Sequence, residues 1–258
     1  MLFFVLIAGL ATGVLLGLMG SGGAIITVPA LIYLLDVEPK SAIAMSLGII
    51  AVTATIAAVQ AWRQGNVNLR VTLTFGLFGA LGTFAGARLG VVLPVVLQLT
   101  LFALVMYAAA WRMLKARPPR RSAGAMAVGE CENGDCADFP YFQIAGHGVM
   151  VGLLAGVVGV GGGFLIVPAL VLLSGLSMRR AVGTSLSIVA FQSTAGFAGY
   201  AGAVPIDYAL LAGFTAVAVA ACFLGARIGQ RMEQRKLKHG FGVFLILVAT
   251  YILIKSLV

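Results

Sequence analysis

Long apolar runs separated by short polar stretches dominate the chain. They cover about residues 2–35, 41–62, 70–88, 91–114, 142–174, 180–202, 206–227 and 239–257. A membrane-spanning helix needs about 20 apolar residues, and the runs show none of the alternation of apolar and polar positions that marks a half-buried strand. Because only helices and closed barrels cross a bilayer, the pattern predicts an all-α integral membrane protein.

The chain repeats itself at an offset of 139 residues, without a gap. The matched segments are residues 20–23 with 159–162, 28–31 with 167–170, 46–47 with 185–186, and 86–90 with 225–229. Shared apolar composition would scatter such matches rather than align them. We therefore predict an N-terminal membrane repeat over residues 1–114, a linker over 115–140 and a C-terminal membrane repeat over 141–258, a duplication typical of secondary transporters.

The first apolar run of each half is longer than one ordinary span, and a glycine cluster interrupts it, since glycine is a poor residue for a helix interior. Such a run either crosses the membrane once or turns back to the side it left. If both runs turn back, one face keeps Lys40, Arg88 and Lys255, and the other collects the remaining 14 of the 17 Lys and Arg residues. If both runs cross, the split is 8 against 9. Cytoplasmic loops are enriched in Lys and Arg, so we expect both runs to turn back.

Each half then makes three net crossings, and two such halves in series are inverted relative to each other. The expected fold has two inverted-topology repeats, each with a broken re-entrant helical hairpin plus three transmembrane helices. Both termini would lie outside and the linker 115–140 in the cytoplasm. No basic segment precedes the first apolar run, so we expect that run to be a membrane segment rather than a cleaved signal peptide.

Composition and charge narrow the function. Hydrophobic residues make up 61% of the chain and charged residues 10%. The net charge of +9 comes from Lys and Arg at the ends of apolar runs, where they anchor helices, so it does not indicate nucleic acid. No Asp or Glu lies centrally in an apolar run, which leaves a buried proton relay without a candidate. No phosphate-binding glycine–lysine motif is present either. We expect a transporter rather than an enzyme, with no cofactor and no metal site.

The two glycine clusters are the first candidates for substrate binding. A half-helix follows each cluster, and helix N-termini offer free N–H groups and a partial positive charge to an anion. Inversion would bring the two N-termini toward one site. The predicted binding residues here are Gly20, Ser21, Gly22, Gly23, Gly159, Gly161, Gly162 and Gly163. Close helix packing is the prediction instead for Gly13, Gly17, Gly152 and Gly156.

Polar side chains inside the apolar runs are the second group of candidates. Ser46, Thr53 and Gln60 lie seven residues apart on one helix face, and Ser185 and Gln192 repeat that spacing. Amides and hydroxyls would complete the hydrogen bonding of an oxyanion, and helix–helix hydrogen bonding is the alternative. The predicted binding side chains are Ser46, Thr53, Ser185, Gln192, Ser193 and Thr194.

These motifs resemble the TauE/SafE sulfite exporter family. The resemblance rests on residues 17–31 and their echo at 156–170, on the paired Gly-Ala-Arg-x-Gly segments and on residues 183–186, and it covers both halves. It implies a secondary transporter in the bacterial inner membrane that exports sulfite, a sulfonate or a related small anion by alternating access. Ser21 and Ala24 stand where the second half has Val160 and Gly163, so we do not expect equivalent half-sites.

Three other functions stay open on the sequence. They are cation-coupled import of an organosulfur anion, a channel, and an intramembrane thiol enzyme that uses Cys131 and Cys136 of the linker. The expected partners are a small anionic substrate, either sulfite or an organosulfonate, and the lipid bilayer, with no nucleic acid and with a homodimer left open. Cys222 lies in an apolar run and is expected to be a core residue.

Overall fold

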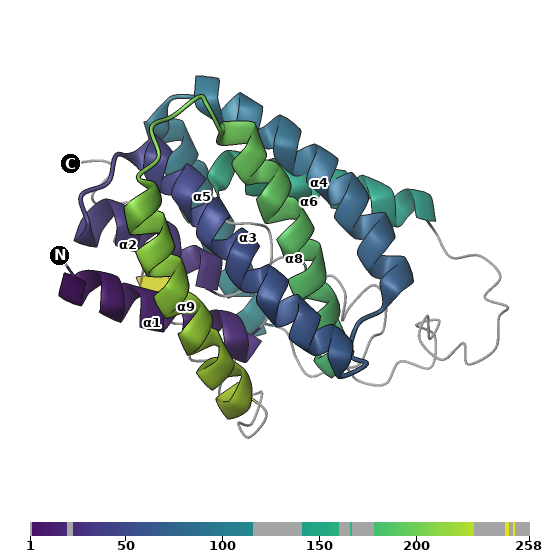
Figure 1. Cartoon of the computed structure of the whole chain (residues 1–258). Coiled ribbons are helices and arrows are strands. Elements are labelled where there is room, and N and C mark those ends of the chain that lie inside the picture. The colour runs from purple at the N-terminus through teal and green to yellow at the C-terminus, as the bar shows by residue number, and fades with distance from the viewer. Residues whose placement is uncertain are drawn as a thin grey trace, which may run out of the picture.

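The structure is a computed structural model, and it describes residues 2–19, 23–115, 141–159, 166, 178–229, 246–247 and 250. Its helices are α1 (Leu2–Met19), α2 (Gly23–Leu34), α3 (Pro39–Arg63), α4 (Leu69–Val92), α5 (Val95–Lys115), α6 (Tyr141–Val158), α8 (Met178–Tyr200) and α9 (Tyr208–Gly229). They pack side by side in a bundle (Figure 1). The described residues contain no strand, so the predicted all-helical fold is confirmed for them.

The outer surface of the bundle is apolar. Within the described part of the chain, three helices are long and apolar enough to cross a membrane, namely Pro39–Arg63, Leu69–Val92 and Tyr208–Ile228. On α4, Leu73, Leu77 and Leu81 follow one another at four-residue spacing and are 57–64% exposed, while Gly79 and Gly82 on the opposite face are buried. Large side chains outside and small ones inside indicate a helix that faces lipid and packs closely against its neighbours.

The first apolar run is broken at its glycine cluster. A continuous helix would hold residues 12 and 23 about 16 Å apart, but Gly23 lies directly against the carbonyl oxygen of Thr12 and the side chain of Leu16. The chain therefore reverses between α1 and α2 and forms a helical hairpin. In the second half, α6 ends at Val158, the position that matches Met19 of α1. Most of the following segment lies outside the described residues.

The packing of α1 on α9 matches the packing of α6 on α4 at the offset of 139 residues. An added Cβ at Gly13 would collide with the Ala218 carbonyl oxygen, and one at Gly152 would collide with the Gly79 carbonyl oxygen. Gly17 meets Cys222 of α9 in the same way as Gly156 meets Thr83 of α4. The predicted packing role of Gly13, Gly17, Gly152 and Gly156 is thus confirmed. The first helix of each half packs against a helix of the other half.

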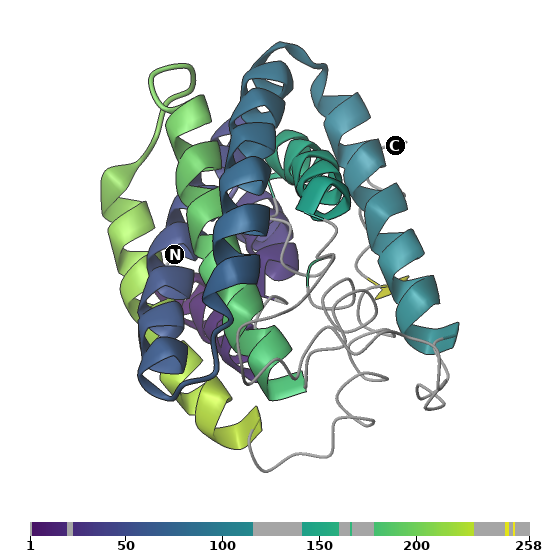
Figure 2. The same ribbon diagram turned by 90° about the vertical axis from the view of Figure 1, so that its right-hand side faces the viewer.

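Helices α3 and α8, which match in the repeat, lie side by side and run antiparallel. Gly48 of α3 lies against Phe197 near the end of α8, and Gly183 near the start of α8 lies against Ala61 near the end of α3. Helix α9 packs on α3, and α4 packs on α8, so these four helices form a row (Figure 1). Figure 2 shows α5 at one edge of the bundle, beside α6.

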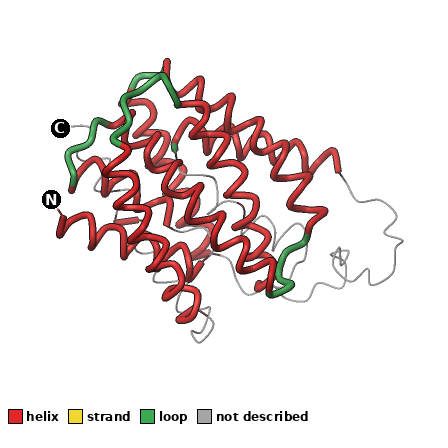
Figure 3. Tube along the Cα trace, in the orientation of Figure 1, coloured by secondary structure: helices red, strands yellow, loops and turns green. Residues whose placement is uncertain are grey.

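The described loops lie at two opposite ends of the bundle (Figure 3). One end, called here the acidic end, holds the loops over residues 35–38, 93–94 and 201–207, and its described charged residues are Asp36, Glu38, Lys40, Arg88 and Asp207. The other end, called here the basic end, holds the loop over residues 64–68 and the start of α8. The charged residues whose side chains are described there are Arg63, Arg70, Arg180 and Arg227. Lys40 and Arg88 are therefore separated from those four arginines, as expected for a first run that turns back.

Candidate functional site

Helix α6 ends inside the bundle at Gly159, where the backbone has a φ of 76°. Glycine adopts this left-handed conformation readily, and it is the usual way to end a helix. The Gly159 N–H closes the last turn on the Ala155 carbonyl at 2.8 Å. The Ser46 hydroxyl of α3 lies 2.7 Å from the Gly159 carbonyl oxygen and donates to it, and it lies equally close to the Ile43 carbonyl of its own helix. Ser46 therefore ties the end of α6 to α3.

A buried polar cluster satisfies the last carbonyls of α6, which no residue of the helix itself can pair. The Gln98 Nε2 of α5 donates to the carbonyls of Val157 at 3.0 Å and Gly90 at 2.9 Å, and it lies 3.2 Å from the Tyr200 hydroxyl. That hydroxyl donates to the Gly156 carbonyl at 3.3 Å. Side chains from α5 and α8 thus hold the C-terminal end of α6 in the protein interior.

In the sequence, Gln98 and Tyr200 of the polar cluster have no polar counterparts at the repeat offset. At the offset of 139 residues, Gln98 matches Leu237 and Tyr200 matches Ala61, so the residues that would cap the end of α1 are apolar. Neither Gln98 nor Tyr200 is among the residues predicted from the sequence, although a glutamine within the apolar run 91–114 is the signal that marks the place. The predicted difference between the two half-sites is consistent with this contrast.

Gln192 presents an amide to the interior without a partner. Its side chain is fully buried on α8, and the structure gives neither Nε2 nor Oε1 a hydrogen bond. The amide fills the space that a side chain at Gly79 of α4 would otherwise occupy. Ser193 beside it is also fully buried, and its hydroxyl has no partner. Unpaired buried polar groups are rare in proteins because each costs about 1–3 kcal/mol, so each calls for an explanation.

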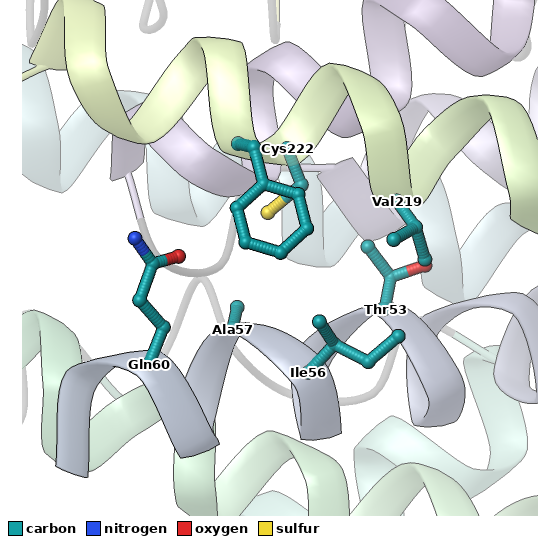
Figure 4. Close-up of a pocket in the computed structure, with 7 residues that line it drawn as sticks. Thr53, Ile56, Ala57, Gln60, Val219 and Cys222 are labelled. Carbon is teal, nitrogen blue, oxygen red and sulfur yellow. The ribbon is translucent and has the colours of Figure 1, made fainter. Parts of the chain in front are cut away.

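Thr53 matches Gln192 in the repeat and lies near the middle of α3. Its hydroxyl donates to the Ile49 carbonyl at 2.7 Å. The side chain lines a crevice between α3 and α9, whose walls are Thr53, Ile56, Ala57, Gln60, Val219, Cys222 and Phe223. In Figure 4, Thr53 and Gln60 lie toward opposite ends of the crevice and the Cys222 sulfur lies between them. The crevice has no room for a water molecule, so this part of the bundle is closed.

Thr53 and Gln192 lie at the same level of the bundle, because the antiparallel contacts pair residue 48 with 197 and residue 61 with 183. This level is about midway along α3 and α8. The described charged side chains lie toward the two ends of the bundle, and the described residues contain no group of three metal-ligating side chains. The interior at this level offers amide and hydroxyl groups without a formal charge.

The sequence profile described as Sulfite exporter TauE/SafE matches residues 5–252. The chain belongs to this TauE/SafE family. A protein from Xylella fastidiosa called "Probable membrane transporter protein" is 30% identical to it over 96% of this chain and 94% of its own length. "Probable membrane transporter protein YdhB" of Bacillus subtilis is 26% identical over 88% of this chain and 89% of its own. No solved structure gives a significant match. The resemblance to the family is confirmed, and the family is one of membrane transporters.

The structure sorts the side chains predicted for this TauE/SafE protein into three groups. Gln192, Ser193 and Thr53 are buried at the middle level of the bundle. Ser46 is occupied by its bond to Gly159, and the buried Ser185 donates to the Val182 carbonyl at 2.9 Å. Thr194 lies on the exposed side of α8 and bonds to the Ala190 carbonyl of its own helix at 2.8 Å, so it is not brought to the buried group.

The glycine clusters of this TauE/SafE protein are described at their edges. Gly23 is buried as the first residue of α2, and Gly159 caps α6. The predicted residues Gly20, Ser21, Gly22, Gly161, Gly162 and Gly163 lie outside the described residues, as do Cys131 and Cys136 of the linker. Cys222 is a free, buried thiol, as predicted.

Proposed function

We propose that this protein is a secondary transporter of small sulfur-containing anions such as sulfite or a sulfonate. The observation that carries the proposal is Gln192, a fully buried amide at the middle level of the bundle with both polar atoms unpaired. Among the described residues, Gln192 alone has two buried side-chain atoms without a hydrogen bond, whereas Gln98, Ser193 and three other residues each have one. A substrate-binding residue keeps its hydrogen-bonding capacity free for the substrate, and polar groups inside a membrane bundle commonly mark a transport pathway.

The two halves act, in this proposal, as inverted repeats. The matched helices α3 and α8 run antiparallel, which supports inversion. The exchange of packing partners, α1 on α9 and α6 on α4, supports one symmetric unit made from both halves. The break between α1 and α2 places an N-terminus, at Gly23, inside the bundle, where its N–H groups favour an anion. A matching break after α6 completes the site in the proposal.

Export across the inner membrane by alternating access is the direction we propose. The basic end faces the cytoplasm in this proposal, because cytoplasmic loops are enriched in Lys and Arg, and the acidic end faces outward. Expelling one negative charge from a negative interior gains about 2.3 kcal/mol per 100 mV, so a coupling ion is not required. The closed crevice beside Thr53 fits a conformation in which the pathway is shut on that side.

Flux into and out of proteoliposomes tests the transport proposal. With an imposed inside-negative potential and no cation gradient, we expect sulfite to leave the vesicles through the wild-type protein. Gln192→Leu should lower this flux at least about tenfold, the effect of one lost hydrogen bond to a charged group of about 1.5–3 kcal/mol. Thr194→Val is the matched control, because Thr194 neighbours Gln192 but faces outward, and it should transport normally. Strict dependence on a Na⁺ or proton gradient would favour cation-coupled import instead.

A further inference from the structure

The unpaired amide of Gln192 has a donor end and an acceptor end. A substrate oxygen can accept from Nε2, but Oε1 needs a hydrogen-bond donor, and the structure gives it none. Whichever way the amide is oriented, one unpaired donor and one unpaired acceptor remain. Fully deprotonated sulfite or sulfate has only hydrogen-bond acceptors. It could accept from Nε2, but its negative oxygens would be repelled by Oε1.

The charged residues of the helices around Gln192 set a second condition on the ligand, which concerns its net charge. The helices that contact α8 most closely are α3 and α4. The described charged side chains of these three helices are Lys40, Arg63, Arg70, Arg88 and Arg180, and all of them lie toward helix ends. His147 of α6 lies outside the described side chains. The desolvation cost of an ion grows with the square of its charge, so a dianion without a cationic partner would lose about four times as much as a monoanion.

Ser193 adds a further unpaired hydroxyl beside the amide. A hydroxyl both donates and accepts, so it matches a ligand that carries groups of both kinds. The amide lies against Gly79 of α4, which offers no side-chain donor to Oε1. A ligand, or a water that travels with it, can supply the missing donor.

We propose, granting that the protein transports small sulfur-containing anions, that Gln192 selects singly charged species that retain a hydrogen-bond donor. Hydrogensulfite in its O–H form and hydroxyalkyl sulfonates meet both conditions. Sulfate and fully deprotonated sulfite fail on charge and on the donor, and simple alkyl sulfonates fail on the donor alone. The protein thereby recognises the protonation state of its substrate through a neutral amide rather than through a charged residue.

Two sulfonates of equal charge isolate the role of the donor. 2-Hydroxyethanesulfonate and ethanesulfonate differ by one hydroxyl, so their competition with radiolabelled sulfite in proteoliposomes compares a ligand with and without a donor. We expect 2-hydroxyethanesulfonate to compete about tenfold more strongly than ethanesulfonate in the wild type, the effect of one hydrogen bond, and sulfate to compete weakly. Gln192→Met should bring the ratio of the two sulfonates close to one, and Thr194→Val should leave it unchanged. Sulfite flux should also fall as the pH rises, in proportion to the fraction of sulfite that is present as hydrogensulfite.

The outcomes separate this proposal from the transport function itself. Equal competition by the two sulfonates in the wild type, with sulfite still carried, would overturn selection by Gln192 and leave the transport function standing. A preference for 2-hydroxyethanesulfonate that persists in Gln192→Met would place the acceptor elsewhere and overturn it as well. Absence of any sulfite or sulfonate flux through the correctly folded wild type would overturn the proposed function. The wild-type comparison needs no substitution, so it holds even if Gln192→Met fails to fold.

Discussion

At the scale of a single residue, the buried amide of Gln192 lowers the free energy of unfolding. Both ends of its amide are buried without a partner, and an apolar side chain of similar shape would remove that cost. We expect Gln192→Met to raise the free energy of unfolding by about 1–3 kcal/mol while it impairs transport. Thermal unfolding in detergent measures the change, with Thr194→Val as the control. A less stable Gln192→Met would mean that the amide has a structural partner.

Gln98 differs from Gln192 at its amide nitrogen. Its Oε1 is also buried without a hydrogen bond, but its Nε2 has three polar atoms within hydrogen-bonding distance. We expect Gln98→Leu to lower the free energy of unfolding by about 2–4 kcal/mol, since it leaves the Gly90 and Val157 carbonyls unpaired in the interior. Thr100→Val on the same helix is the control, because Thr100 is exposed and bonds to its own helix. Equal unfolding temperatures for the two variants would contradict a structural role for Gln98.

At the scale of the helix, glycines set the distance between α6 and α4 and between α1 and α9. A Cβ at Gly152 would collide with the Gly79 backbone, and the helices would have to separate. We expect Gly152→Ala to cost about 1–3 kcal/mol of stability, and Gly13→Ala, its mate in the repeat, to cost a similar amount.

Gly213 provides the matched control for these two substitutions. It lies within α9, and an added Cβ there would meet nothing within 4 Å. Gly213→Ala should be neutral or stabilising by up to about 1 kcal/mol, because alanine favours a helix more than glycine does. Denaturation of the three variants followed by circular dichroism checks the ranking. Equal losses at all three glycines would show that close contact is not the cause.

At the scale of the whole molecule, the acidic and basic ends predict the orientation in the membrane. In a variant in which Cys131, Cys136 and Cys222 are replaced by serine, Ala203→Cys and Gln64→Cys place one exposed thiol at each end. We expect a membrane-impermeant maleimide to label Ala203→Cys on intact cells and Gln64→Cys only after permeabilisation, because positive loops stay in the cytoplasm. Labelling in the reverse pattern would overturn the proposed orientation in the membrane, and with it the outward direction of transport.

The helical pattern and the break in the first run followed from the sequence because they depend on local properties. Apolar length marks a span, and a glycine cluster ends a helix, wherever these segments lie in space. The repeat was visible because matched glycines, prolines and arginines recur at one offset. The packing role of Gly13 and Gly152 followed from their small size and helical spacing alone.

Only the tertiary structure decided which helix meets which and where each polar side chain points. Ser46 and Gly159 are 113 residues apart in sequence, and Gln98 and Tyr200 are 102 apart, so no local pattern relates them. Thr194 and Gln192 are both polar residues in one apolar run, but Gln192 is buried and Thr194 is exposed. The difference is set by the rotation of α8 against α3 and α4, which depends on contacts across the bundle rather than on the order of residues.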